Sequence, residues 1–308
     1  MILAGMGGSG HPGDLLNALG ITTKPLYVHR NYDLPLQYLG NMGFTKTLFI
    51  ASSYSGNTEE PLTGYELARE KNIPILASAA GGQLEEQAHR DNVPFCTLDY
   101  PDMQPRHTLF AAFTGIYTAL RNSNLVKNID EDLQRVAEVI HRRTPELERP
   151  AQELAQKIKG KVPVFSSGDS LGFATKNFKI QVNENAKYPA FWSTFPELNH
   201  NEMTGFGNAK LACGEQTAFH VLLIHDENEN DHIKSRIATT GSLYKKWGVE
   251  VSEFTAEGDS LLEKLFQVIT FGLWTSYFLA LEYDVDPIPV PAVEEFKAEH
   301  ARNVGKTS

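Results

Sequence analysis

Short apolar runs alternate with amphipathic helical patterns through the first half of the chain. The apolar runs end in polar or glycine-rich segments, which is the pattern of buried strands. We expect strands at 1–4, 26–29, 47–51, 74–77 and 93–98, and helices at 13–19, 60–71, 84–89 and 110–121. Strands separated by helices of this length predict a parallel sheet with helices on both faces.

The alternation restarts after a charged helical stretch at 131–143. Pro145 and Pro150 interrupt that stretch, because proline lacks the amide proton that a helix interior needs. Further strands are expected at 162–166, 218–224 and 249–254, and further helices at 151–159, 172–182, 231–247, 261–283 and 293–302. The fold class is therefore α/β, with two doubly wound α/β/α sandwich subdomains on parallel sheets, at 1–148 and 149–308.

Charge and cysteine content narrow the class of protein. The 308 residues carry a formal net charge of −10, whereas a nucleic-acid surface needs clustered Lys and Arg, so we expect no nucleic-acid partner. Cys96 and Cys213 lack a C-x-x-C spacing, and we interpret both as reduced thiols of a cytoplasmic protein. Without a run of roughly 18 apolar residues, or a basic stretch before an apolar N-terminal core, we expect no membrane span and no signal peptide.

Two glycine- and hydroxyl-rich turns stand out, each between a predicted strand and a predicted helix. Residues 5–10 read GMGGSG and residues 53–58 read SYSGNT. Free backbone N–H groups and the positive end of a helix dipole stabilise a phosphate at such a turn. Neither turn is a Lys-bearing nucleotide loop or a dinucleotide fingerprint. The turns therefore predict a small phosphorylated metabolite as ligand.

The hydroxyl groups of the second turn are the candidate phosphate donors. Ser53, Ser55 and Thr58 supply O–H groups without charge. Gly8 and Ser9 of the first turn are expected to shape the near side of the same pocket. Both turns follow strands of one parallel sheet, where ligands bind beyond the carboxyl ends of the strands.

These turns, together with the segments 183–187 (NENAK) and 196–202 (PELNHNE), resemble the bifunctional phosphoglucose/phosphomannose isomerases of the sugar isomerase (SIS) fold. The resemblance covers nearly the whole chain and includes Asp-Pro, Val-Pro and Phe-Lys pairs within 286–297. It implies two SIS-type subdomains in a homodimer. It also implies interconversion of glucose 6-phosphate, and of mannose 6-phosphate, with fructose 6-phosphate through a cis-enediol, without cofactor or metal.

An aldose–ketose isomerisation needs a base for the C2 proton and a polar group that opens the sugar ring. Glu184, at the end of the predicted helix 172–182, is the candidate base, and Glu202 remains its rival. His200 is the candidate ring-opening group, since an imidazole both donates and accepts a proton near neutral pH. The resemblance implies that this histidine reaches the active site of the neighbouring subunit.

The resemblance also implies two cations. Arg106 follows the strand 93–98 by a short loop on the ligand side of the sheet, and corresponds to a charge that stabilises the enediolate. Lys297 corresponds to a group near the ring oxygen or the phosphate. Members of the family can carry a small hydroxyl residue before this lysine that helps to admit mannose, whereas residues 289–291 here read Pro-Val-Pro.

Other interpretations remain open on the sequence alone. His220, His225 and His232 are weaker candidates for chemistry, and they do not show the spacing of a metal site. A non-catalytic regulator that binds a phosphosugar would keep the hydroxyl turns but could lose Glu184. An isomerase of another sugar phosphate would share the same fold.

Overall fold

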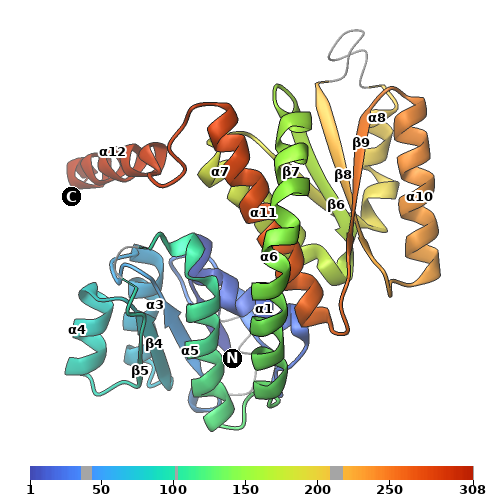
Figure 1. The fold of residues 1–308 in the computed structure, drawn as a ribbon. Coiled ribbons are helices and arrows are strands. Elements are labelled where there is room, and N and C mark those ends of the chain that lie inside the picture. Colours follow the sequence, from blue (N-terminus) through green and yellow to red (C-terminus); the bar gives the residue numbers. More distant parts are fainter. Residues whose placement is uncertain (36–43, 101–102, 209–217, 308) are drawn as a thin grey trace. The chain divides into compact units, whose positions relative to one another are not determined.

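The computed structural model describes residues 1–35, 44–100, 103–208 and 218–307 and divides the chain into two compact units (Figure 1). Unit 1 is Met1–Ile129 and unit 2 is Asp130–Ser308. The division lies at the start of helix α6 (Asp130–Ile158), whereas the predicted boundary between 148 and 149 falls inside that helix.

The helix α6 continues through the two prolines that were expected to interrupt it. Pro145 and Pro150 are both exposed, so the carbonyl groups that they leave without a helical partner can be solvated. Leu147, Ala151 and Leu154 are buried along one side of the helix. Burial of that apolar stripe therefore holds the helix together across both breaks.

Unit 1 contains a parallel sheet of five strands in the order β2-β1-β3-β4-β5. The strands are β1 (Ile2–Ala4), β2 (Tyr27–His29), β3 (Phe49–Ser52), β4 (Ile75–Ala79) and β5 (Phe95–Thr97). The helices are η1 (Gly7–Gly10), α1 (His11–Leu19), η3 (Phe44–Lys46), α3 (Glu59–Glu70), α4 (Gly82–Arg90), η4 (Pro105–His107) and α5 (Leu109–Asn122).

The three inner strands of unit 1 are buried on both faces. Every residue of β1, β3 and β4 is buried, as expected for a parallel sheet between helical layers. On one face, Phe49 packs against Tyr65 of α3 and against Gly64, where an added Cβ would lie 2.6 Å from the Phe49 ring. The alternation read from the sequence thus gives the predicted parallel architecture.

Unit 2 contains a second parallel sheet, of four strands in the order β7-β6-β8-β9. The strands are β6 (Val162–Gly168), β7 (Phe191–Phe195), β8 (Phe219–Asp226) and β9 (Glu250–Ala256). The helices besides α6 are η5 (Asp169–Leu171), α7 (Gly172–Asn185), η6 (Glu197–His200), α8 (Glu202–Phe206), α10 (Asp231–Lys246), α11 (Leu261–Glu282) and α12 (Pro291–Thr307).

Two helical layers cover the faces of this second sheet (Figure 1). The helices α6, α7 and α11 lie on one face, where Phe165 stacks on Phe178 and Phe254 stacks on Phe271. The helices α8 and α10 lie on the other face and pack against Val221. Residues on adjacent positions of a strand therefore point into different layers.

Within the described ranges, α11 is the one helix with the length and composition of a membrane span. Of its most apolar 18-residue window, 67% is buried inside the structure. It packs between α6 and α7, and Leu265, Ile269 and Leu279 are fully or almost fully buried. These are the properties of a core helix.

Candidate active site

The two hydroxyl-rich turns of unit 1 follow neighbouring strands. The strands β1 and β3 pair in parallel, so the turns after Ala4 and Ser52 emerge at the same edge of the sheet. The Ser9 hydroxyl accepts a hydrogen bond from the backbone N–H of Tyr54 at 2.9 Å. This bond joins the first turn to the second, so the two turns form one polar surface.

Hydroxyl groups hold the second turn in shape. Ser53 is fully buried, and its hydroxyl donates to the Thr58 Oγ1 at 2.8 Å and accepts from the Thr58 N–H at 3.4 Å. Ser55 is exposed, and its hydroxyl accepts from the Asn57 N–H at 3.2 Å. Gly56 has a φ of +67°, and an added Cβ would lie 1.7 Å from the Gly81 carbonyl oxygen, so the turn requires glycine there. Ser53 thus shapes the turn, while Ser55 presents its hydroxyl to solvent.

Arg106 lies in η4, directly against the first turn. Its side chain is buried, with 2% exposed. A Cβ added at Gly8 would lie 2.8 Å from the Pro105 carbonyl oxygen and 3.1 Å from the Arg106 nitrogen. The absence of a side chain at Gly8 therefore lets the Arg106 backbone approach the turn. Arg106 is therefore a buried cation whose backbone adjoins the first turn.

Glu184 lies in the last turn of α7, in unit 2. It is half-buried and lines a recess of about 100 Å³ with Lys187, Val290 and Val293. The Lys187 ammonium donates to the carbonyl oxygen of Asn185 at 3.1 Å and to that of Asp286. It thereby ties the end of α7 to the segment that leads into α12. The sequence indicates Lys187 as a neighbour of Glu184 in the NENAK segment, but not the long-range bond of Lys187 to Asp286.

Lys297 lies on α12, outside the recess that Glu184 lines. Its side chain is 65% exposed, and its ammonium forms an ion pair with Glu294 at 2.9 Å, one turn earlier on the same helix. The structure therefore places the start of α12 beside Glu184, through Val290 and Val293, but pairs Lys297 with its own helix.

The rival bases Glu184 and Glu202 lie on opposite faces of the second sheet. Glu202 begins α8, and a hydrogen bond joins it to Ser193 of β7. Partial desolvation raises the pKa of Glu202, and the Ser193 bond opposes that rise. Its charge also contributes to the raised pKa of Tyr244 in α10. Glu184 instead belongs to α7, in the layer with α6 and α11 (Figure 1).

His200 ends η6 and is exposed. Its ring has no hydrogen-bond partner within the described residues of the chain. The neighbouring Asn199 is instead held by α10, because its amide donates to the Thr240 hydroxyl at 2.8 Å and accepts from Arg236 at 3.3 Å. The backbone at His200 is thus fixed while its imidazole faces solvent.

Two comparisons with known sequences decide the family. Residues 147–299 match the model of the bacterial phospho-glucose isomerase C-terminal SIS domain. A bifunctional phosphoglucose/phosphomannose isomerase of Caldicellulosiruptor bescii is 32% identical over 307 residues, which cover 96% of this chain and 88% of that protein. The chain belongs to the bifunctional phosphoglucose/phosphomannose isomerase family.

Two further proteins place this family member among its relatives. A D-glucosamine-6-phosphate 4-epimerase of Sulfolobus acidocaldarius is 38% identical over 208 residues, which cover 65% of this chain and 61% of that protein. A crystal structure of a hypothetical protein of Thermus thermophilus has a TM-score of 0.78 at 16% identity and covers 98% of this chain and 83% of its own. The epimerase is thus a relative with a different activity at a comparable sequence identity. The crystal structure shows that the fold is shared.

Unit 2 also has a small polar turn, at 166–170 (SSGDS). The Glu229 carboxylate occupies this turn. A Cβ added at Gly168 would lie 1.9 Å from the Glu229 Oε2, and the same oxygen accepts from the Ser170 hydroxyl at 3.0 Å. A negative group in this position repels a phosphate. The turns of unit 1 therefore remain the candidate phosphate site. No spacing in the sequence links Glu229 to Gly168, which lies 61 positions earlier.

The structure describes one of the two cysteines. Cys96 is a free thiol in the described part of the chain, and burial raises its pKa. Cys213 lies outside the described residues.

Proposed function

We propose that this isomerase interconverts glucose 6-phosphate, and mannose 6-phosphate, with fructose 6-phosphate through a cis-enediol intermediate. The observation that carries the proposal is the joined pair of turns in unit 1, in a chain of the phosphoglucose/phosphomannose isomerase family. The bond from Tyr54 to Ser9 joins two phosphate-type turns, and Arg106 is buried beside them. A sugar phosphate offers the anion that such a surface binds.

The proposed roles divide between the two units. In unit 1, Ser55 and Thr58 bind the phosphate directly, Ser53 orients them, and Gly8 and Ser9 form the adjoining wall. The phosphate then acts as a handle whose binding energy holds the reacting carbons in place. The hydroxyl groups of the 53–58 turn carry no charge. Arg106 therefore supplies the positive charge that balances the phosphate.

Unit 2 supplies the proton transfer. Glu184 removes the proton from C2 of the open-chain aldose and returns it to C1, which leaves the ketose. Arg106 stabilises the enediolate oxygen, and Lys297 acts near the ring oxygen or the phosphate. Both aldoses give the same enediol, because they differ only in configuration at C2. The half-buried position of Glu184 in its recess supports the role of base, since partial removal of water strengthens its interaction with a polarised sugar.

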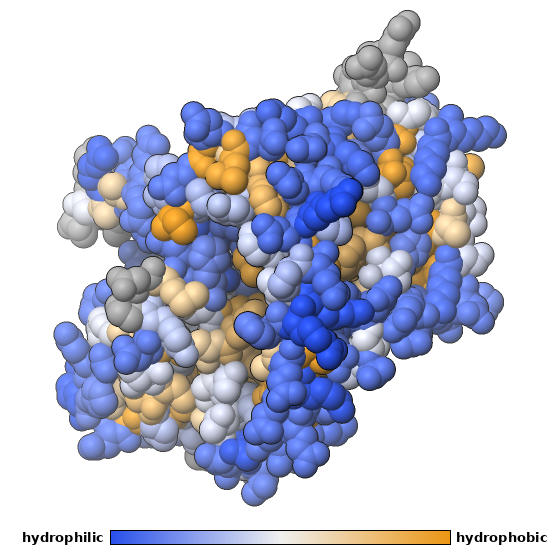
Figure 2. Space-filling view, in the orientation of Figure 1, coloured by the Kyte–Doolittle hydropathy of each residue, from blue (hydrophilic) through white to orange (hydrophobic). Residues whose placement is uncertain are grey.

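His200 opens the ring, and we place it in the active site of a second subunit of a cytoplasmic homodimer. Its ring is exposed and has no partner among the residues that the structure describes, which supports a role outside its own unit. Phe191 and Trp192 are 56% and 38% exposed on β7, which is an edge strand. The face drawn in Figure 2 is mostly hydrophilic with separate hydrophobic patches, and an aromatic edge strand is the kind of surface that a second copy covers.

A coupled assay for fructose 6-phosphate tests the activity. We expect turnover of both aldose phosphates by the purified chain, and a raised KM with little change in kcat for Ser55→Ala, because that hydroxyl binds the non-reacting phosphate. Ser123→Ala is a matched control, since the Ser123 hydroxyl bonds to the Ala119 carbonyl at the end of α5. No fructose 6-phosphate from either aldose would refute the proposal.

The 38% identity to the 4-epimerase favours a second candidate, epimerisation of an amino-sugar phosphate. The substrate panel therefore includes glucosamine 6-phosphate, with the C4 configuration of the product read by NMR. Inversion at C4 without formation of fructose 6-phosphate from the hexose phosphates would favour this second activity.

Mixed dimers test the position of His200. A His200→Ala chain keeps Glu184, and a Glu184→Gln chain keeps His200, so each parent dimer is inactive in both sites. If the histidine crosses the interface, half of the randomly mixed dimers have one intact site of two, and activity returns to about a quarter of wild type. If His200 acts within its own subunit, mixing restores nothing.

A further inference from the structure

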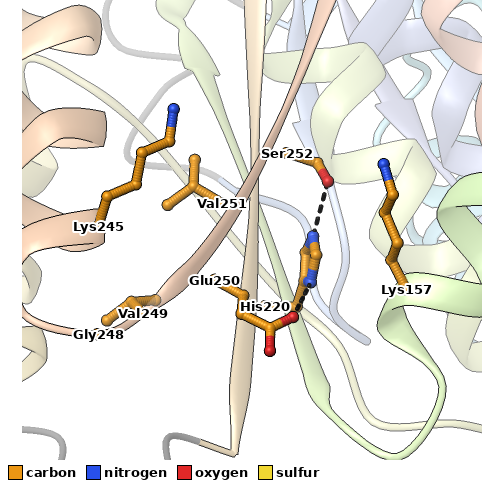
Figure 3. A pocket seen from close by; sticks show the side chains of 8 residues that line it. All are labelled: Lys157, His220, Lys245, Gly248, Val249, Glu250, Val251 and Ser252. Atoms are coloured by element: carbon orange, nitrogen blue, oxygen red, sulfur yellow. Dashed lines mark hydrogen bonds and ion pairs between the residues drawn. The ribbon is translucent and has the colours of Figure 1, made fainter.

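A second polar cavity lies at the amino-terminal ends of β8 and β9, within unit 2 (Figure 3). Its volume is about 520 Å³, within the range of small-molecule sites. His220, Glu250, Ser252 and Lys157 line it, and none of them has a role in the proposed isomerisation. The three polar residues of β8 and β9 are adjacent because the strands pair His220 with Glu250.

The three side chains form an ordered chain of contacts. The His220 Nε2 lies within hydrogen-bond distance of the Ser252 hydroxyl, at 2.9 Å, whereas its Nδ1 lies 3.4 Å from a Glu250 carboxylate oxygen without hydrogen-bond geometry. Figure 3 draws both contacts on one side of β9. His220 is 2% exposed and so is held in place, while Ser252 is only half-buried. A hydroxyl, an imidazole and a carboxylate in this order are the components of an activated nucleophile.

The buried position of His220 favours a neutral imidazole. Burial lowers the pKa of His220, and this effect exceeds the opposing effect of Glu250. Lys161 and Lys157 lower the pKa further, and Lys161 also forms an ion pair with Glu250. A neutral ring has a free electron pair to accept the serine proton.

A cation stands beside this chain of contacts. Lys157 belongs to the last turn of α6 and is exposed, without an ion pair or hydrogen bond to the described residues. Figure 3 draws it on the same side of β9 as Ser252, whereas Lys245 lies on the opposite side. An ammonium there stabilises negative charge that develops on a substrate oxygen.

We propose that Ser252, His220 and Glu250 form a second catalytic site that hydrolyses small carboxylic esters. The Ser252 oxygen attacks the ester carbonyl as its proton moves to His220 Nε2, and Lys157 faces the oxyanion. The C–O bond to the alcohol breaks, and the alcohol leaves with the proton from His220. Water then attacks the acyl-serine, gives its proton to His220, and releases the acid as Ser252 regains its proton. One ester and one water thus give one acid and one alcohol.

Covalent labelling of the intact chain with an alkyl fluorophosphonate tests this directly, since the probe reacts with activated serines. We expect one added phosphonyl group by intact mass, mapped to the peptide of Ser252, and none on Ser252→Ala. The Ser242→Ala variant is the matched control, because the exposed Ser242 hydroxyl bonds to the Ala238 carbonyl of its own helix. Labelling of Ser252→Ala at the wild-type rate, or no labelling of the wild type, would overturn the proposal.

Hydrolysis of p-nitrophenyl acetate gives the second readout. Ser252→Ala should lower kcat/KM by about 100-fold, or to the non-enzymatic rate, with isomerase activity unchanged. Glu250→Gln tests the positioning role of Glu250. It should reduce turnover and move the acidic limb of the pH profile to lower pH, because the carboxylate no longer raises the pKa of His220. An unshifted profile would show that Glu250 does not act on His220, and equal hydrolysis by Ser252→Ala would exclude the site.

Discussion

Replacing Gly8 by alanine tests the link between the first turn and Arg106. The added Cβ would lie 2.8 Å from the Pro105 carbonyl oxygen, and an ordinary contact begins at 3.4 Å, so the two backbones must separate by about 0.6 Å. Both atoms belong to backbone and cannot rotate away. The Arg106 segment therefore has to move as a unit.

The expected effects have two parts. Forced separation of two packed backbones costs about 1–3 kcal/mol of stability. Because a displacement near 1 Å at a catalytic group costs about 100-fold, a shift of this size at Arg106 should lower kcat/KM for glucose 6-phosphate by roughly 10-fold or more.

Urea unfolding and the coupled fructose 6-phosphate assay measure both effects. Gly115→Ala is the matched control in the same unit, since its Cβ would have only the Cys96 Cβ nearby among the described residues, at 3.8 Å. Alanine in that helix should raise stability by up to about 1 kcal/mol and leave kcat/KM unchanged. Wild-type activity in Gly8→Ala would show that the approach of Arg106 to the turn does not matter for the reaction.

Three further changes test other parts of the structure. The folded state lowers the pKa of His220, so acid protonates this histidine in the unfolded chain first and favours unfolding. His220→Gln should therefore reduce the loss of unfolding free energy between pH 7 and pH 5. An unchanged pH dependence in urea titrations would contradict this. Asp226→Asn should cost about 3–5 kcal/mol of unfolding free energy, since it leaves the buried Lys264 ammonium without its carboxylate, and Asp226→Asn with Lys264→Met should recover part of that loss. Val290→Thr places a hydroxyl in the recess that Glu184 lines. It should raise kcat/KM for mannose 6-phosphate, relative to kcat/KM for glucose 6-phosphate, by about 2- to 10-fold. A ratio that does not rise would show that position 290 does not influence the choice of sugar.

Most parallel strands of both units could be predicted, because each is a short apolar run between two amphipathic helical patterns. The edge strand β7 was not predicted. Its residues Phe191 and Trp192 are both exposed, so the segment lacks the apolar–polar alternation that identifies a half-buried strand. Only the pairing of Phe165 with Trp192 in the folded chain makes it a strand.

The boundary between units shows the limit of local rules. Proline disfavours a helix interior, so the two prolines of 131–159 predict breaks in the helix. The structure keeps one helix because an apolar stripe is buried along one side, which is a tertiary effect. A boundary read from Pro145 and Pro150 thus fell 19 residues after the observed one, at 148 rather than 129.

Candidate site residues could be proposed from the sequence where their chemistry is local. The 53–58 turn and Glu184 stand in short segments whose residue types alone indicate a role. The contacts that organise them are long-range, such as the approach of Gly8 to Pro105. The same holds for the capping of the second unit's turn by Glu229 and for the chain from Ser252 to His220. Such contacts need the fold before they can be seen.

The most direct test of the central claim compares Glu184→Gln with Glu202→Gln at saturating glucose 6-phosphate. Both changes remove one carboxylate at constant size, and thermal melting verifies that each variant is folded. If Glu184 moves the proton between C2 and C1, its variant should lose about 10²- to 10⁴-fold in kcat, while Glu202→Gln stays within a few-fold of wild type. Activity of Glu184→Gln close to wild type, or the large loss in Glu202→Gln instead, would contradict the account.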